Sequence, residues 1–142
     1  VDECPALTGR LHFTTQNALF IIFQLVFFEK RTHTIGRYIE TCLYDEESPN
    51  VRGSAFKVLA HYGSTTPKRS EKVWPSLSDA IRCWHRDVVF MDMVGDLITL
   101  LEGKCSPRVR MEASELFEFD VNSNDLALKK KAQYIVSLKP EE

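Results

Sequence analysis

The sequence predicts an all-helical protein whose helices pack against one another in series. Apolar residues recur at spacings of three and four along most of the 142-residue chain, which is the period of an amphipathic helix. Only six glycines and six prolines are present, fewer turn residues than an all-β protein of this length would need. No segment shows the apolar–polar alternation of a half-buried strand.

Composition fits a globular protein with a sizeable core, because apolar residues make up 44% of the chain and charged residues 27%. The net charge of −2 provides no overall basic field to attract nucleic acid or an anionic membrane. We therefore expect one domain over residues 1–142.

The first half predicts three helices. One begins near Thr14 and runs to about Lys30; its nearly all-apolar run, 18–28, is shorter than the roughly 20 residues of a membrane span, so we expect a buried core helix. One face of the second helix consists of Ile35, Tyr38, Ile39, Cys42 and Leu43. Ser48 caps the third, Pro49 opens it and Gly63 ends it. Its apolar stripe is Val51, Ala55, Val58, Leu59 and Tyr62.

The second half predicts a polar loop over 64–72, followed by four helices. A short helix begins around Trp74-Pro75-Ser76 and runs to about His85. The next carries the stripe Phe90, Met93, Val94, Leu97 and Leu101, and Gly103 closes it. Ser106-Pro107 opens a third helix, with Val109, Ala113, Leu116 and Phe117 inside. After a turn at 122–125, a final helix spans about 124–138, with the lysines 129–131 on its solvent face.

An internal repeat is the strongest signal. Residues 48–55 and 106–113 both follow the pattern S-P-x-V-R-x-x-A, and an amphipathic helix precedes each copy. Serine and proline begin the helix, valine starts the buried stripe, and alanine lets a paired helix approach closely. Arginine can reach an acidic side chain of a neighbouring unit. The structural repeat positions are Val51, Arg52, Ala55, Val109, Arg110 and Ala113.

This pattern resembles the second helix of HEAT repeats, with serine in place of the usual aspartate. The resemblance implies a right-handed α-solenoid of stacked helical hairpins of the HEAT/armadillo type. The two copies lie 58 residues apart, whereas such units span about 40–47. A three-helix armadillo-like unit absorbs the extra length, so we expect units at about 15–62 and 74–118, with the final helix at 124–138. We also expect the chain to be part of a longer solenoid.

No catalytic, metal or cofactor site is predicted. The four histidines show no i, i+4 pair, and no glycine-rich phosphate loop occurs. Cys83-Trp84-His85 places a thiol near an imidazole, but successive helical residues point apart. Asp92, Asp96 and Glu102 could be paired acids, yet their spacing favours a solvated helix face. The cysteines, at 4, 42, 83 and 105, fit neither a zinc site nor a disulfide framework, so we expect free thiols and an intracellular protein, cytoplasmic or nuclear.

We therefore expect a non-enzymatic scaffold or adaptor that binds a peptide or helix of another protein. The resemblance implies that second helices form a concave face, which would carry Ser54, Lys57, His61, Glu112, Glu115 and Phe119. One alternative is a purely structural part of a larger scaffold, held by a neighbouring subunit. A lesser alternative is contact with nucleic acid through Lys68-Arg69, Lys104 with Arg108, and Lys129 to Lys131. Thr66, followed by proline in the predicted loop, is a candidate regulatory phosphosite.

Overall fold

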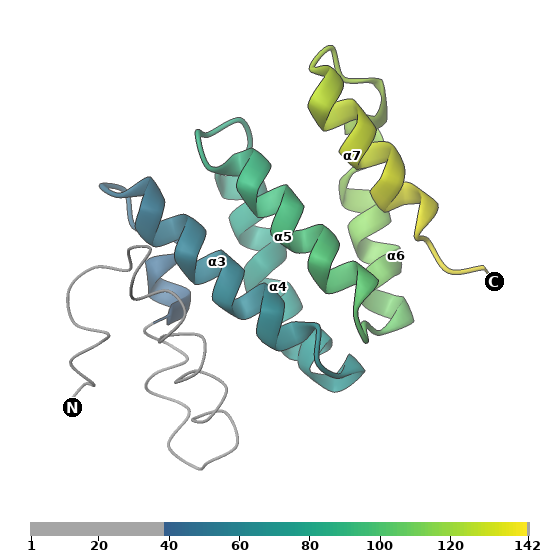
Figure 1. The fold of residues 1–142 in the computed structure, drawn as a ribbon, viewed down its shortest axis with the longest axis horizontal. Helices are drawn as coiled ribbons and strands as arrows, with labels where there is room; N and C mark the ends of the chain where they lie inside the picture. The colour runs from purple at the N-terminus through teal and green to yellow at the C-terminus, as the bar shows by residue number, and fades with distance from the viewer. Residues whose placement is uncertain (1–38, 142) are drawn as a thin grey trace.

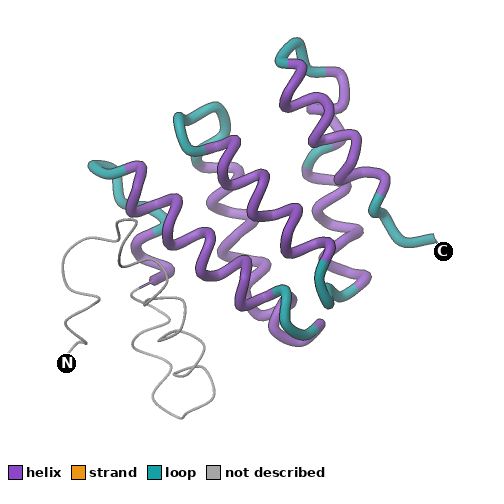
Figure 2. The backbone as a smooth tube through the Cα atoms, viewed as in Figure 1, coloured by secondary structure: helices purple, strands orange, loops and turns teal. Residues whose placement is uncertain are grey.

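A computed structural model describes residues 39–141, and within them it contains helices and turns but no strand (Figures 1 and 2). After a helical end at residues 39–42, the elements are α3 (Pro49–Gly63), α4 (Pro67–Cys83), α5 (Phe90–Glu102), α6 (Pro107–Leu116), the 3-10 helix η2 (Glu118–Asn122) and α7 (Leu126–Ser137). The predicted all-helical class is therefore confirmed for this part of the chain. The predicted helix ending near Lys30 and the unit start at 15 lie outside the described residues.

The helices form two layers. Helices α3, α5 and α7 lie side by side in one layer, and α4 and α6 lie behind them (Figure 1). Successive helices reverse direction and alternate between the layers. Helices of the front layer begin at Pro49, Phe90 and Leu126, which are 41 and 36 residues apart, while α4 and α6 begin 40 residues apart, at Pro67 and Pro107.

Three helices begin at a hydroxyl residue followed by proline. Ser48, Thr66 and Ser106 each accept a hydrogen bond from the backbone N–H three residues later, so each satisfies one of the free donors of its helix. Asp125 does the same for α7, accepting from two backbone N–H groups. The predicted caps at residues 48, 106 and 122–125 are thus confirmed.

The loop predicted over 64–72 is wrong, because α4 already begins at Pro67 and only residues 64–66 connect it to α3. The predicted start of a unit at residue 74 consequently falls inside a continuous helix. Pro75 lies within α4, although it has no N–H to give the carbonyl four residues earlier. The first two turns of α4 are mostly exposed and polar, which removes the apolar period that would have revealed them.

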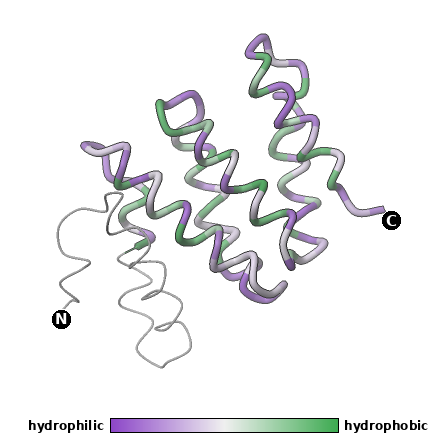
Figure 3. The backbone as a smooth tube through the Cα atoms, in the orientation of Figure 1, coloured by the Kyte–Doolittle hydropathy of each residue, from purple (hydrophilic) through white to green (hydrophobic). Residues whose placement is uncertain are grey.

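The core fills the space between the layers and between neighbouring helices. The predicted stripes of α3 and α5 are buried throughout, and Leu77, Ile81, Val109 and Ala113 join them from the back layer. Hydrophilic residues concentrate at the connecting turns (Figure 3). Gly63 belongs to this packing, since a Cβ atom there would lie 2.6 Å from Val73 Cγ2.

Hydrogen bonds tie the turns together at both ends of the molecule. At one end, the Ser106 N–H donates to Ser70 Oγ at 3.0 Å, and the Lys104 N–H donates to the Ser64 carbonyl at 2.9 Å. At the other end, Trp84 Nε1 donates to the Leu43 carbonyl at 2.7 Å. These bonds satisfy polar groups that helix packing alone would leave without partners, and they fix the spacing between successive hairpins.

Candidate functional site

A groove of about 570 Å³ runs between α3 and α5 on the exposed side of the front layer. Its walls combine small, charged and apolar residues, and Lys131 of α7 closes one side. The residues that matter for its chemistry are Gly53, Ser54, Lys57, Asp92, Gly95 and Asp96. The groove exists because both facing helices carry small side chains where they meet.

Two glycines leave the floor of this groove open. A Cβ atom at Gly95 would meet no other atom within 4 Å, and one at Gly53 would make only an ordinary 3.8 Å contact with Val89. Glycine inside a helix is less stable than alanine by about 0.5–1 kcal/mol. Packing within the described residues thus gives no reason for glycine at position 95, whereas close approach by a ligand would give one.

Charged side chains line the groove above these glycines. Lys57 Nζ lies 3.5 Å from Asp96 Oδ1, and the side chain of Asp96 is only 16% exposed against 45% for Lys57. Burial raises the pKa of Asp96 above its ordinary value, although Lys57 and His61 oppose this effect. Asp92, one helical turn before Asp96, is exposed. The predicted solvated face of α5 is therefore wrong for Asp96, which belongs to the α3–α5 contact.

Two of the six predicted partner-binding residues line this groove, and a third lies close to it. Ser54 and Lys57 line it, and Ser54 is largely buried. His61, one turn further along α3, is half-buried and interacts electrostatically with Asp96 and Lys57; burial lowers its pKa. These three predicted residues belong to α3, and the helix that packs beside them in the same layer is α5 and not α6.

The other three predicted residues lie on different surfaces. Glu112 and Glu115 belong to α6 in the back layer, and Phe119 lies in η2. Glu112 accepts hydrogen bonds from Trp74 Nε1 at 2.7 Å and from Arg108 Nε at 3.2 Å, which together hold the pKa of its carboxyl low. Because α3 and α6 occupy opposite layers, the six predicted residues do not form one face.

The six repeat positions lie at helix starts and face the interior. Val51, Arg52, Ala55, Val109 and Ala113 are buried, and Arg110 is partly buried. Each arginine reaches back seven residues to a carbonyl of the preceding turn, Arg52 to Asp45 at 2.7 Å and Arg110 to Gly103 at 3.0 Å. The motif therefore closes a helix–turn–helix junction.

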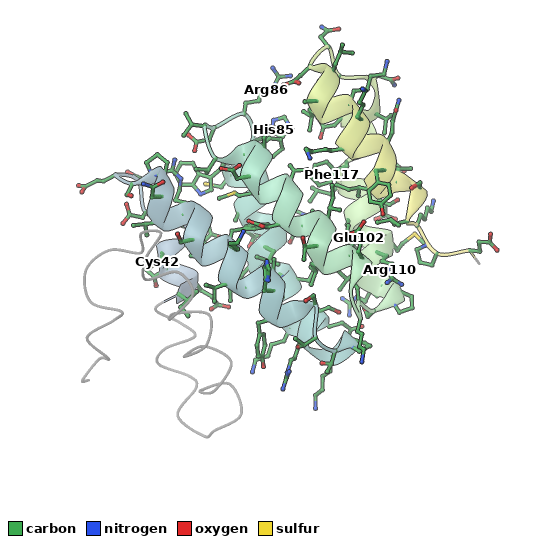
Figure 4. The ribbon with its side chains drawn as sticks, in the orientation of Figure 1. Cys42, His85, Arg86, Glu102, Arg110 and Phe117 are labelled. Atoms are coloured by element: carbon green, nitrogen blue, oxygen red, sulfur yellow. The ribbon has the colours of Figure 1, made fainter. Side chains whose placement is uncertain are left out.

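The expected pairing of a repeat arginine with an acidic side chain of a neighbouring turn is present for Arg52 and absent for Arg110 within the described residues. Arg52 also pairs with Asp87 of the α4–α5 turn, and its guanidinium carbon lies 4.0 Å from the centre of the Trp84 ring. This pairing keeps the pKa of Asp87 below its ordinary value. Arg110 instead donates to two carbonyls beside the end of α5, near Glu102 (Figure 4). Within the described residues, it therefore bonds to backbone oxygens and to no carboxylate.

Thr66 has a structural task that sequence reasoning did not assign. Its Oγ1 accepts the Arg69 N–H at 3.1 Å and so caps α4. The candidate phosphosite thus lies at the cap position of α4, at the end of the short connection 64–66. The signal was available, because Thr66-Pro67 repeats the hydroxyl–proline pattern of the two recognised caps.

The cysteines and the basic residues of the sequence lie apart from one another. Cys42, Cys83 and Cys105 are free thiols. The predicted basic pair Lys104 and Arg108 belongs to α6 and the turn before it, and Lys129 to Lys131 belong to α7. Among residues 39–141, no three histidine, cysteine or acidic side chains lie close enough to hold a metal ion. No helix in this part of the chain is long and apolar enough to cross a membrane.

Sequence reasoning missed the surroundings of Arg86. This residue has a positive φ of 70° and lies with His85 at the end of the molecule where the α4–α5 turn faces η2 (Figure 4). Its conformation depends on the turn that follows α4, and the hydrophobic period gives no information about that turn.

Comparisons with protein families, with curated proteins and with solved structures find no match to this chain.

Proposed function

We propose that this chain is a protein-binding module whose α3–α5 groove receives a helix or an extended peptide of a partner. The observation that carries this function is the open floor at Gly95, where a mid-helix glycine leaves space that the described residues do not fill. A backbone can approach another backbone closely only where side chains are small.

The alternating layers support the further proposal that the helices belong to a HEAT/armadillo-type solenoid. Helices of one layer recur every 36 to 41 residues, close to the roughly 40–47 residues of such units. This period replaces the 58-residue spacing of the two sequence motifs. Under this arrangement, α3, α5 and α7 are equivalent helices of successive units and together would present the binding surface.

The groove favours a partner that carries both charge signs around a narrow contact strip. The exposed Lys57 offers a cation and the exposed Asp92 a carboxylate, whereas the largely buried Asp96 pairs with Lys57. The partly buried Met91 adds a flexible apolar contact beside them. We expect small or apolar partner side chains over Gly95 and a basic residue near Asp92.

We propose a non-enzymatic role for this site. Lys57 and Asp96 pair with each other across the groove, so each neutralises the other instead of standing alone as a general acid or base. Their arrangement is suited to fixing the orientation of a bound chain, because polar groups around a narrow apolar strip define a register.

Photo-crosslinking tests this function at the groove itself. A photoreactive phenylalanine analogue in place of Asp92 should crosslink a partner in cell extract, because Asp92 is exposed at the groove wall. The matched control carries the same analogue in place of Lys68, which is exposed on α4 in the back layer. A partner captured from position 92 and not from position 68 would support the groove. Equal capture from both, or capture from position 68 alone, would contradict it.

A further inference from the structure

A second hollow, of about 470 Å³, lies at the end of the molecule away from the α5–α6 turn. The end of α4, the turn after it, the end of α6 and η2 surround it. It shares no residue with the α3–α5 groove. Its character is also different, because it joins cations on one wall to apolar side chains on the other.

Arg82 and Arg86 form the basic wall of the hollow, and Arg86 has an unfavourable backbone conformation. Arg86 has φ of 70°, a left-handed geometry that glycine adopts readily after a helix and that side chains with a Cβ atom disfavour. Its side chain is exposed and makes no hydrogen bond or ion pair within the described part of the chain. The strain thus places a free guanidinium at the hollow without an internal contact to offset it. Arg82, also exposed, lies on the same wall.

The apolar wall consists of Leu116 and Phe119, with Ile81 at the base. Phe119 is 92% exposed, the highest value among the large hydrophobic residues that the structure describes. Beside Leu116 and the unpaired Arg86, this exposed ring offers an apolar surface that a partner side chain can cover.

Two acidic side chains at this end are already paired. Asp120 Oδ1 lies 3.4 Å from His85 Nε2, and Asp79 Oδ1 lies 3.1 Å from Arg82 Nη1. Arg86 is therefore a cation that forms no ion pair with a carboxylate of the described residues.

We propose that this hollow binds an acidic peptide segment that carries one aromatic or large aliphatic side chain. The peptide side chain packs against Phe119 and Leu116, and a flanking carboxylate pairs with Arg86 through the planar guanidinium fork. Nucleic acid fits less well, because the hollow offers one unpaired cation, Arg86, beside an apolar wall, whereas nucleic-acid sites neutralise several phosphates. This site stands independently of the function proposed for the α3–α5 groove.

A randomised linear peptide library displayed on phage tests this site, with the whole chain as bait. Arg86→Gly removes the cation and relieves the left-handed strain, so this variant should fold at least as well as the native chain. Phe119→Ser removes a ring that packs against almost nothing, so it should also leave the fold intact. Leu126→Ser, at an exposed apolar residue outside the hollow, is the matched control.

We expect the library to yield peptides with aspartate or glutamate beside a leucine, phenylalanine, tyrosine or tryptophan. Each hollow variant should weaken their binding about tenfold or more, while Leu126→Ser and the groove variant Gly95→Leu leave it unchanged. Selected peptides that lack acidic residues, or that bind the Arg86→Gly and Phe119→Ser variants as well as the native chain, would overturn the inferred site. A fluorescent single-stranded oligonucleotide whose binding depends on both residues would overturn it in favour of nucleic acid.

Discussion

Replacing Gly95 by alanine should stabilise the fold, whereas replacing Gly63 by alanine should destabilise it. At Gly95 the new methyl group meets no atom within 4 Å, so the helix gains about 0.5–1 kcal/mol from the reduced backbone entropy of the unfolded chain. At Gly63 the methyl group would lie 2.6 Å from Val73 Cγ2 and 2.8 Å from Leu100 Cδ1.

Ordinary contacts between carbon atoms are about 3.5–4.0 Å, so these side chains would have to move by roughly 1 Å. Overpacking of this kind typically costs about 1–3 kcal/mol. We therefore expect the two variants to differ by about 1.5–4 kcal/mol in the free energy of unfolding, with opposite signs relative to the native chain.

Urea denaturation followed by circular dichroism measures this difference, and thermal unfolding should show about 4 °C of Tm per kcal/mol for a chain of this length. Gly53→Ala, whose methyl group makes one ordinary contact, should behave like Gly95→Ala. If Gly95→Ala destabilised the chain, the floor of the groove could not be open. If Gly63→Ala were neutral, α3 could not pack as closely as described.

Three further changes test other parts of the structure. Arg52→Lys should lower the free energy of unfolding by about 2 kcal/mol, because an ammonium cannot bond the carbonyl and the carboxylate together while it covers a tryptophan ring. The control is Arg82→Lys at an exposed position, which should change the free energy of unfolding in urea by less than about 0.5 kcal/mol. Equal effects of the two changes would argue against the buried guanidinium contacts of Arg52. Arg86→Gly should raise stability by about 1 kcal/mol, measured in the same urea titration, and a loss would mean that its left-handed conformation is not strained. Burial lowers the pKa of His61, so the folded state binds fewer protons there; this contribution to stability is present above about pH 6.5 and is lost as pH falls. Urea titrations of His61→Gln across this range should show a weaker fall in stability below pH 6.5 than the native chain shows, and an unchanged slope would contradict the assignment.

Helix positions could largely be predicted from the sequence, because each stripe that faces the core leaves a period of three and four residues. The stripes of α3 and α5 were recovered in full, and the caps at Ser48 and Ser106 marked two helix starts. The predicted start of α4, near Trp74, is too late, because the first two turns of this helix face solvent and carry no apolar stripe. Thr66-Pro67 marks its start with the same hydroxyl–proline pattern as Ser48-Pro49 and Ser106-Pro107.

The layer of each helix could not be read from the repeated motif. Serine, proline and arginine in this motif stabilise a local junction, and either layer can use such a junction. Three helix-to-helix steps separate α3 from α6, so strict alternation places them on opposite sides. The acidic residues Glu112 and Glu115 were therefore assigned to a face that they do not share with Lys57. The groove at Gly95 exists because glycine has no side chain there. The spacing of apolar residues does not reveal such a space.

Binding of the crosslinked partner to groove variants tests the central claim most directly. Gly95→Leu fills the groove without meeting any neighbouring atom at its Cβ position, and Gly95→Ala fills it less; Glu115→Lys alters the exposed back layer and is the control. The measurement is the Kd of each variant by isothermal titration calorimetry, beside its thermal stability. We expect affinity to fall in the order native, alanine, leucine while stability does not fall, and Glu115→Lys to bind as the native chain does. Undiminished binding by Gly95→Leu would show that the partner does not enter the groove between α3 and α5.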